Sequence, residues 1–462
     1  MKRQIYNYLL QWKDSVNRKP LIVRGARQVG KTYTIEEFGR NNFEVYVKVN
    51  FEETPELKTI FQTNNVAEII QSIELYTGKK IPAGSALLFL DEIQACPEAI
   101  TVLRYFYEKM PLLHTISAGS LLDHQLSNLK YAMPVGRVEF AYMYPMSFYE
   151  FLSAIDEEQL VNYLEDFSLE KEISLPVHNK LLRLIRLYYF IGGMPESVKV
   201  YRQTQNLSDV EKVHESILKS LEFDFGKYGT RLQQNLLIKI LRYIPKGTGQ
   251  KLKYVNIDPA TRSEYLKEGL QLLEKSRIVH LIKSTNATLP PLEYGANEKI
   301  FKPLFLDIGL ANHLLKLRLL DIGQLITANE GSLAEQFTGQ QFLTFPPFYV
   351  DKQLFYWNRE KRNSEAEIDY LVEVNGEAVP VEVKAGKTGS LKSLHIFMAE
   401  KGKQVALRVN TGLPSTVRVD TTVKVNNKYQ KVNYRLLSLP LYLINEKVLA
   451  RIISGSSSFR SH

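Results

Sequence analysis

The sequence predicts an α/β protein that begins with a parallel sheet wrapped by helices and continues into helical and mixed segments. Strand-like and helix-like segments alternate through about the first 150 residues, and a glycine-containing loop follows the first strand. Near residue 375, two alternating strands meet at a tight turn. At 462 residues, the chain is longer than one hydrophobic core usually serves. We expect a parallel-sheet domain over 1–150, a helical lid over 151–240, a winged-helix-like domain over 241–295 and a second α/β domain over 296–450.

The first strand, over Leu21–Val23, leads into a loop that fits the phosphate-loop pattern G-x-x-x-x-G-K-[ST]. Gly25 and Gly30 allow the loop to curl so that its amides converge on phosphate oxygens, as do the first N–H groups of the following helix. Lys31 places a positive charge on the β- and γ-phosphates during catalysis, and the Thr32 hydroxyl has the right length to ligate Mg²⁺. The loop therefore predicts a nucleoside triphosphate site. The expected nucleotide-binding residues are Gly25, Ala26, Arg27, Gln28, Val29, Gly30, Lys31 and Thr32.

Another strand, over Ala86–Leu90, is an apolar run that ends in Asp91 and Glu92. An aspartate in this position holds Mg²⁺, and the glutamate beside it orients and deprotonates the attacking water. The same carboxylates could instead cap a helix before Pro97. With the phosphate loop upstream, they favour ATP hydrolysis, with Asp91 and Thr32 as metal ligands and Glu92 as the catalytic base.

Two more residues are candidates for contact with the γ-phosphate. Strands are also predicted over Glu44–Asn50 and His114–Ser117, and Ser120 follows the latter where a polar side chain could sense that phosphate. Arg137 lies in a loop from which it could reach the γ-phosphate of a neighbouring subunit in a homo-oligomer. An arginine supplied in this way raises the rate by about 10³- to 10⁵-fold. A solvated loop arginine is an equally open interpretation.

Composition narrows the class of protein. Hydrophobic residues make up 44% of the chain and charged residues 24%, as in ordinary globular proteins. The sequence has no apolar run of about 18 residues, and its N-terminus lacks the apolar core of a signal peptide. We therefore expect no membrane segment and a cytoplasmic protein. The single cysteine, Cys96, excludes an internal disulfide and a cysteine zinc cluster.

The positive charge of the chain is concentrated at its C-terminus. Residues 391–462 contain 12 Lys and Arg against 3 Asp and Glu, which equals the whole excess of +9. Such a segment attracts polyanions, so it indicates DNA as a partner, although it could also serve solubility alone.

The middle of the chain predicts helical modules. From Tyr149 to about Arg242 the pattern is almost wholly helical, as expected for a lid, and Gly192–Pro195 interrupts it with a sharp turn. Residues Leu252–Ile282 resemble a helix-turn-helix with a following strand suited to a wing. A winged helix of this kind binds either nucleic acid or protein.

The C-terminal region contains a β-hairpin signal. Alternating strands over Glu367–Val374 and Glu377–Lys384 are joined by an Asn-Gly turn at residues 375–376. A two-residue turn fixes the register, which places Asp369 opposite Glu382. Opposed carboxylates repel each other unless a cation lies between them.

This pairing predicts a second divalent metal site. Lys384 lies on the same face of its strand as Glu382, where its ammonium could orient water or stabilise charge. Asp369, Glu382 and Lys384 form the Asp...Glu-x-Lys pattern of restriction-endonuclease-like folds, and Glu335 lies on a preceding helix where those folds place another acidic residue. Alternating charges on a solvated hairpin would give the same pattern.

With these motifs in view, nearly the whole chain resembles a large family of bacterial and archaeal AAA+ ATPases that carry a C-terminal domain of unknown function. One position departs from the family, because Ala118 precedes Gly119 and Ser120 where a threonine is usual. The resemblance implies ATP as the nucleotide, an AAA+-type lid, a winged helix and a nuclease-like terminal domain. The residues that carry it are Gly25–Thr32, Leu90–Gln94, Val135–Arg137, Tyr144–Phe148, Gly192–Pro195, Phe305–Leu310, Ile368–Tyr370 and Val381–Lys384.

We therefore expect a Mg²⁺-dependent ATPase that couples hydrolysis to a C-terminal nuclease-like or nucleic-acid-binding module. A nucleotide-dependent regulatory or scaffold protein with an inactive nuclease-like domain is an alternative hypothesis. A protein-remodelling ATPase is another.

Overall fold

The computed structural model describes residues 1–119, 134, 136–228, 230–317, 330–359, 366–384, 391–426 and 428–454. The chain divides into two compact units. The first consists of Met1–Tyr144 with two short later segments, Lys275–Ile278 and Pro346–Asp351, and the rest of the chain forms the second unit. The predicted boundaries near 240 and 295 lie inside the second unit and stay predictions.

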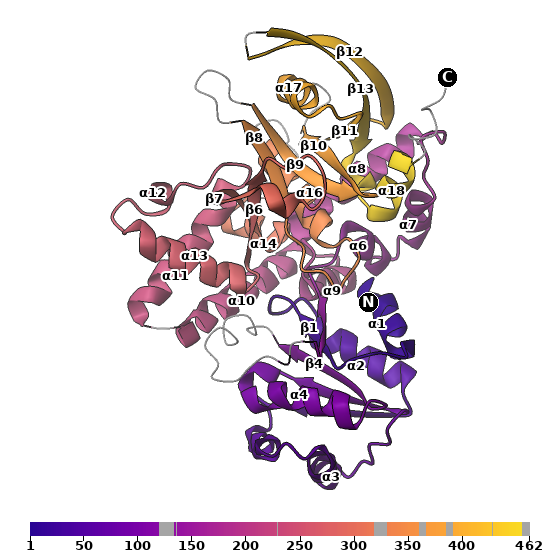
Figure 1. The fold of residues 1–462 in the computed structure, drawn as a ribbon, viewed down its shortest axis with the longest axis vertical. Coiled ribbons are helices and arrows are strands. Elements are labelled where there is room, and N and C mark those ends of the chain that lie inside the picture. Colours follow the sequence, from indigo (N-terminus) through magenta and orange to yellow (C-terminus); the bar gives the residue numbers. More distant parts are fainter. Residues whose placement is uncertain are drawn as a thin grey trace. The chain divides into compact units, whose positions relative to one another are not determined.

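The first unit is built on a five-stranded sheet in the order β2-β3-β4-β1-β5. Two of its strands, β1 and β4, are labelled in Figure 1. All four pairings are parallel, as the alternating pattern of strands and helices predicted. Every residue of β3 is buried, which is the burial expected for a strand covered on both faces. The strands are β1 (Leu21–Arg24), β2 (Val45–Asn50), β3 (Ala86–Asp91), β4 (His114–Gly119) and the unpredicted β5 (Glu139–Tyr142).

Helices of the first unit connect these strands, and the two later segments of the chain complete it. Tyr142, at the end of β5, donates its N–H to the carbonyl oxygen of Phe348 over 2.8 Å. The Arg277 guanidinium also lies over the Tyr142 ring, 4.8 Å from its centroid. The helices and 3₁₀ turns are α1 (Ile5–Asp14), α2 (Lys31–Asn42), η1 (Pro55–Gln62), α3 (Val66–Thr77), η2 (Ile93–Ala95) and α4 (Pro97–Lys109).

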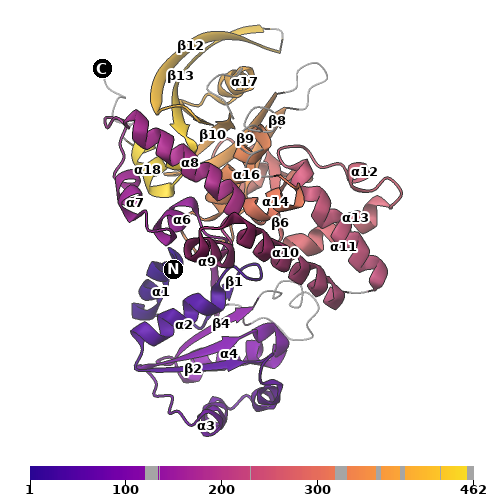
Figure 2. The ribbon, with the colours of Figure 1, turned by 180° about the vertical axis from the view of Figure 1, so that it is seen from behind.

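The second unit begins with the predicted helical region. Seen from behind, α8 runs across the C-terminal sheet (Figure 2). The Nδ1 atom of His178, on α8, lies 2.7 Å from the Tyr442 hydroxyl oxygen. The helices of this region are α6 (Phe148–Ala154), α7 (Glu158–Glu165), α8 (Leu175–Ile191), α9 (Pro195–Thr204), α10 (Leu207–Asp224), α11 (Arg231–Tyr243), α12 (Tyr254–Ile257) and α13 (Ser263–Lys275), with 3₁₀ turns η3 (Phe225–Tyr228) and η4 (Ile244–Gly247).

A buried carboxylate, Asp307, holds the turn between α8 and α9. Its Oδ2 accepts the N–H of Gly193 over 2.6 Å, and its Oδ1 accepts the N–H groups of Gly309 and Leu310 as the N-cap of α14. The amide of Gln340, on α16, donates to the same carboxylate over 3.0 Å. One side chain therefore ties the glycine turn predicted from the sequence to two later helices, α14 (Ile308–Leu314) and α16 (Glu330–Leu343).

The second unit contains a mixed eight-stranded sheet in the order β12-β13-β11-β10-β9-β8-β6-β7. The predicted hairpin is present, because Glu377 pairs with Val374 and the pairing continues to Val381 opposite Tyr370. The strands are β6 (Val279–Thr285), β7 (Ala296–Phe305), β8 (Phe355–Arg359), β9 (Ala366–Val374), β10 (Glu377–Val383), β11 (Val405–Asn410), β12 (Ser415–Val425) and β13 (Lys428–Pro440), accompanied by η5 (Leu292–Gly295), α17 (Lys392–Lys401), η6 (Leu441–Leu443) and α18 (Glu446–Ser454).

The strand predicted as a wing lies in the interior of a larger sheet. It is β6, and it pairs with β7 and β8 inside the eight-stranded sheet. Five of its seven residues are buried, so it is covered on both faces as an interior strand is. α12, in the expected helix-turn-helix, spans only four residues. Among the described residues, no helix is long and apolar enough to cross a lipid bilayer.

Candidate nucleotide site and C-terminal carboxylate cluster

The phosphate loop lies between the end of β1 and the start of α2. A Cβ atom at Gly25 would lie 2.2 Å from the carbonyl oxygen of Met143, directly after β5, so the backbone there leaves room for glycine alone. Gly30 has a φ of 92°, in the region that glycine favours, and it is the N-cap of α2. Both glycines of the pattern therefore occupy positions that favour glycine.

Arg3, in the N-terminal segment, forms hydrogen bonds with this loop and with the segment after β5. Its Nη1 donates to the carbonyl oxygen of Val29 and its Nη2 to that of Tyr144, both over 2.7 Å. Arg3 is 8% exposed, so these charge-assisted bonds are shielded from water. Its role was not predicted, because no motif surrounds it and these two acceptors are backbone atoms.

Lys31 is buried inside the loop. It is 8% exposed, and its Nζ donates to the carbonyl oxygens of Gly25 over 2.9 Å and Ala26 over 2.8 Å. Burial lowers the pKa of Lys31 to about 8, although the carboxylates of Glu92 and Asp91 act in the opposite direction. A buried ammonium gains strongly from an anionic partner, so the loop fits a phosphate group.

Thr32 and Asp91 are brought together, as their motifs predicted. The Thr32 hydroxyl lies 3.1 Å from Asp91 Oδ1, and Asp91 is 3% exposed at the end of β3. Lys48 and Asn50, on the neighbouring strand β2, also approach this carboxylate, at 3.3 and 3.5 Å. Burial raises the pKa of Asp91, and Lys48 opposes that rise. A hydroxyl and a carboxylate oxygen at this separation are a suitable pair of ligands for Mg²⁺.

The other predicted residues of this site differ in their surroundings. Glu92 directly follows β3 with a φ of 50°, and its carboxylate accepts a short hydrogen bond from the amide of Gln94. Arg137 is 44% exposed and forms an ion pair with Glu108, with 2.9 Å between Nε and Oε1. Ser120 lies outside the described residues.

Sequence reasoning missed Arg277, which a distant segment brings into the first unit. Its guanidinium forms two hydrogen bonds with Asp351, of 2.8 and 2.7 Å, and the residue is 8% exposed. The charge of Arg277 is one of the influences that lower the pKa of Lys31, so it acts electrostatically on the phosphate loop. No local pattern could have found Arg277, because only the folded chain brings it near the motif.

In the second unit, a lysine lies among the predicted metal ligands. Lys302 of β7 is buried, with its Nζ 2.5 Å from Glu367 Oε1, 3.6 Å from Glu335 Oε2 and 3.7 Å from Asp369 Oδ1. Burial alone would lower the pKa of Lys302, but Glu335, Asp369 and Glu367 together raise it. We call Lys302, Glu335, Glu367, Asp369 and Glu382 the carboxylate cluster.

The other predicted lysine, Lys384, lies beside this cluster. Lys384 Nζ lies 2.5 Å from Glu382 Oε1, and the N–H of Val383 donates to Asp369 Oδ2 over 2.7 Å. Burial, followed by the charge of Asp369, raises the pKa of Glu335 to about 8 and that of Glu382 to about 7. Within the described residues, Glu382 Oε2 is buried without a hydrogen-bond partner.

The predicted residues are therefore neighbours, and a metal site among them stays a prediction. No three Asp, Glu, His or Cys side chains in the described part of the chain are arranged to hold a metal ion. The positive charge that opposed carboxylates require is supplied by Lys302 and Lys384. No local pattern indicated Lys302, since β7 lies far from the hairpin along the chain.

Comparison with family models assigns three parts of the chain. Residues 17–152 match the model described as AAA domain. Residues 182–321 match a domain of unknown function (DUF8612), and residues 330–434 match another domain of unknown function (DUF4143). A search of curated proteins finds no match.

The solved structures that match this chain do so at low similarity. A Walker-type ATPase of Pyrococcus abyssi is 14% identical, with 68% of this chain and 95% of that chain covered and a TM-score of 0.43. The ORC2 protein of Aeropyrum pernix in its ADPNP and ADP complexes is 13% identical, with 70% of this chain and 92% of that chain covered and a TM-score of 0.33. The A. pernix ORC1 protein in complex with DNA is 12% identical, with 68% of this chain and 91% of that chain covered and a TM-score of 0.27. These scores are too low for an inference from shape.

The AAA match and the loop geometry agree on the N-terminal part. The matched residues 17–152 include the phosphate loop, Asp91 and Glu92, and they lie on a five-stranded parallel sheet. The chain therefore carries a P-loop AAA-type ATPase domain at its N-terminus.

Proposed function

We propose that the protein is a Mg²⁺-dependent ATPase that couples hydrolysis to a C-terminal module acting on nucleic acid. The observation that carries the ATPase proposal is the 3.1 Å approach of the Thr32 hydroxyl to Asp91, next to the buried ammonium of Lys31. These three groups supply what Mg²⁺ and phosphate oxygens need. The residues of the loop thus fit Mg²⁺-ATP.

Each residue of the site has a separate task in this proposal. Lys31 and the loop amides bind and orient the phosphates, while Thr32 and Asp91 would hold Mg²⁺. Mg²⁺, when bound, neutralises charge on the β- and γ-phosphates. Glu92 orients the attacking water and accepts its proton. Ser120 as a γ-phosphate sensor and Arg137 as an arginine acting across a subunit boundary complete the proposal.

Glu92→Gln should separate binding from hydrolysis. The amide retains the shape of the side chain but cannot accept the proton, so turnover should fall by about 10²- to 10⁴-fold while Mg²⁺-ATP binding persists. Lys31→Ala should instead lose binding, because the phosphates lose their buried cation. Phosphate release and nucleotide binding would be measured on both variants, with Glu98→Gln on α4 as a nearby acidic control. Normal turnover in Glu92→Gln would remove Glu92 as the base.

The nucleic-acid part of the proposal rests on charge and connectivity. The positive excess of the chain lies in residues 391–462, all of which belong to the second unit. Arg277 and Asp351 belong to the nucleotide-binding unit, and each is followed closely by a strand of the eight-stranded sheet, β6 at Val279 and β8 at Phe355. A change at this ion pair can therefore be transmitted along the chain in either direction.

ATP turnover should rise when DNA is added, and the rise should fade with salt because phosphate contacts release counterions. Arg277→Gln should lose most of this stimulation, equivalent to about 1–3 kcal/mol of coupling, because the link to Asp351 is removed. Turnover would be measured with single-stranded, duplex and branched DNA at two salt concentrations. Arg40→Gln, which removes an arginine that is 68% exposed, is the matched control. Wild-type turnover indifferent to every DNA would contradict the coupling and favour a protein-remodelling ATPase.

A specific observation supports a second candidate, in which the nuclease-like domain is retained for binding only. Lys302 already neutralises the carboxylates that a divalent metal would need. In an active nuclease-like site, Glu335, Asp369 and Glu382 would hold the metal and Lys384 would orient water. The two candidates differ in whether the carboxylate cluster can exchange its lysine for a metal ion.

DNA cleavage with Mg²⁺ or Mn²⁺ distinguishes the two candidates. If the cluster is an active metal site, the wild-type protein cuts DNA and Asp369→Asn, which removes a ligand charge, lowers cleavage by at least about 10²-fold. Gel assays at equal protein concentration measure this, with Asp420→Asn on β12 as a control that changes a distant acidic residue. Cutting that survives Asp369→Asn would mean that the opposed carboxylates are not its source.

Lys302→Met should destabilise the protein strongly, since several carboxylates would be left without a buried partner. We expect a loss of about 3–5 kcal/mol. Lys251→Met removes a 38% exposed lysine that lies 3.7 Å from Glu367 and should cost at most about 1 kcal/mol. Thermal unfolding of both variants tests this difference. Recovery of the Lys302→Met midpoint by Mn²⁺ would support an exchangeable metal site, and no recovery would support the binding-only domain.

A further inference from the structure

The hairpin of β12 and β13 has two chemically different faces. The strands pair antiparallel from Ser415 opposite Ser438 to Val425 opposite Lys428, and they curve around α17 (Figure 1). Alternate residues of a strand point to opposite faces, and directly paired residues share one face. One face belongs to the hydrophobic core around α17, to which it contributes Val423, Val425, Val432, Tyr434 and Leu436.

The opposite face is basic. The register pairs Arg418 with Arg435, Asp420 with Asn433, Thr422 with Lys431 and Lys424 with Tyr429 on this face. Among these paired residues, Asp420 is the one carboxylate, and Lys431 lies 3.3 Å from it. Lys428 belongs to the other face, because it pairs with Val425. We call the residues Arg418, Lys424, Tyr429, Lys431 and Arg435 the basic face.

The pairing of Arg418 with Arg435 is unusual for a stable sheet. Like charges directly opposite each other destabilise a pair of strands. Arg418 Nε donates to the Asn433 side chain over 3.2 Å, while Arg435 Nη2 is buried without a hydrogen-bond partner in the described residues. Neither arginine forms an ion pair with any residue that the structure describes, whereas the buried Arg359 pairs with Glu400 at 3.0 Å. The two guanidinium groups therefore lack a compensating anion within the described chain.

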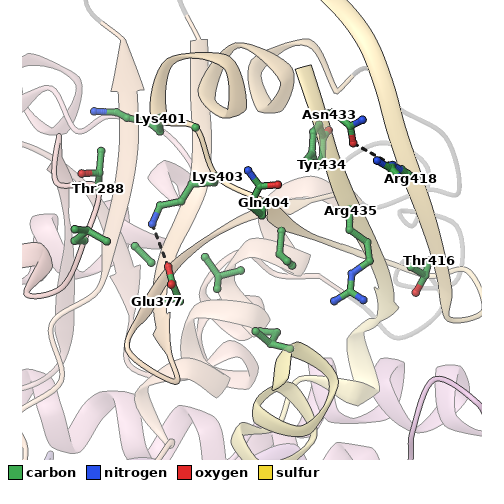
Figure 3. Close-up of a pocket in the computed structure, with 16 residues that line it drawn as sticks. Thr288, Glu377, Lys401, Lys403, Gln404, Thr416, Arg418, Asn433, Tyr434 and Arg435 are labelled. Carbon is green, nitrogen blue, oxygen red and sulfur yellow. Dashed lines mark hydrogen bonds and ion pairs between the residues drawn. The ribbon is translucent and has the colours of Figure 1, made fainter. Parts of the chain in front are cut away.

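A cavity of about 1030 Å³ adjoins this pair (Figure 3). Its lining includes Arg418 and Arg435 together with two lysines, Lys401 at the end of α17 and Lys403 in the segment before β11. Glu377 is the one acidic residue among those that line it, and it lies 3.4 Å from Lys403. In Figure 3, Arg435 extends into the hollow from β13. Four cations against one carboxylate make the cavity attractive to anions.

We propose that the basic face of this hairpin binds the phosphodiester backbone of a nucleic acid, with one phosphate held between Arg418 and Arg435 at the cavity. An arginine pair offers parallel N–H donors that match phosphate oxygens. The cations of β12, Arg418 and Lys424, lie six residues apart, which is about 20 Å at 3.4 Å per residue, so the basic face spans several phosphates. A small phosphate ligand would use only the cavity end. Tyr429, 76% exposed, offers a ring for base stacking near the turn.

This inference rests on the nucleic-acid part of the proposed function and adds a location to it. The test uses the full-length protein and labelled single-stranded and duplex DNA, with affinity measured by fluorescence anisotropy between about 50 and 200 mM salt. The double variant Arg418→Gln with Arg435→Gln should bind at least about tenfold more weakly at low salt. When log affinity is plotted against log salt concentration, the slope for the double variant should be shallower by about two. Each lost arginine contact to a phosphate accounts for about one. Lys428→Gln, which removes a charge from the other face, should change affinity less than about twofold.

Thermal unfolding without DNA gives a second readout. Because the two arginines repel each other, Arg418→Gln should leave the midpoint unchanged or raise it. A clear fall in the midpoint would mean that the arginines serve the fold, which overturns the inference.

The binding outcomes separate this inference from the proposed function. DNA binding that is equal in the wild type and the double variant would overturn the site while leaving the nucleic-acid proposal in place. An equal loss in Lys428→Gln and the double variant would indicate diffuse charge and also overturn the site. No DNA binding by the wild type at low salt would overturn both.

Discussion

The carboxylate cluster of the second unit depends on one buried cation. Lys302 is 1% exposed at its side chain and lies within 4 Å of carboxylates from β9 and α16. A buried charge is stable only when it is paired, so the positions of β7, β9 and α16 are linked through this ammonium. The hairpin of β9 and β10 adds Glu382, whose own partner is Lys384. The same charge balance that stabilises this part of the sheet determines whether a divalent metal can enter it.

The position of Lys302 also bears on coupling to the nucleotide. It pairs with Ile282 across β6 and β7, and β6 begins two residues after Arg277. β8 pairs with both β6 and β9, and it begins four residues after Asp351. Two strands thus run from the Arg277–Asp351 ion pair into the sheet that carries the cluster. Because strands in a sheet cannot slip by one residue without exchanging faces, β6 and β8 keep their register within this sheet. In the proposed function, these two chain segments are the route between ATP hydrolysis and the C-terminal domain.

Local patterns made the nucleotide site and the hairpin predictable from the sequence. The phosphate loop and the end of β3 are contiguous motifs, and the Asn-Gly turn fixed the register that places Asp369 near Glu382. Lys302, Arg277 and Arg3 could not be predicted in the same way, since their partners lie far along the chain. The wing-like strand was assigned from local periodicity, which does not show that β6 has neighbours on both edges. Long-range pairing, not local propensity, determined these outcomes.

The two positively charged sites of the second unit contrast in how their charge is balanced. Lys302 has carboxylate partners within the protein, so its charge stabilises the folded chain. Arg418 and Arg435 face each other across two strands, and no ion pair involving them occurs among the described residues. Folding alone does not compensate such a pair, which keeps its attraction for an external anion. In the function that we propose, the C-terminal domain binds nucleic acid through its edge hairpin, and the carboxylate cluster determines only whether the bound strand is also cut.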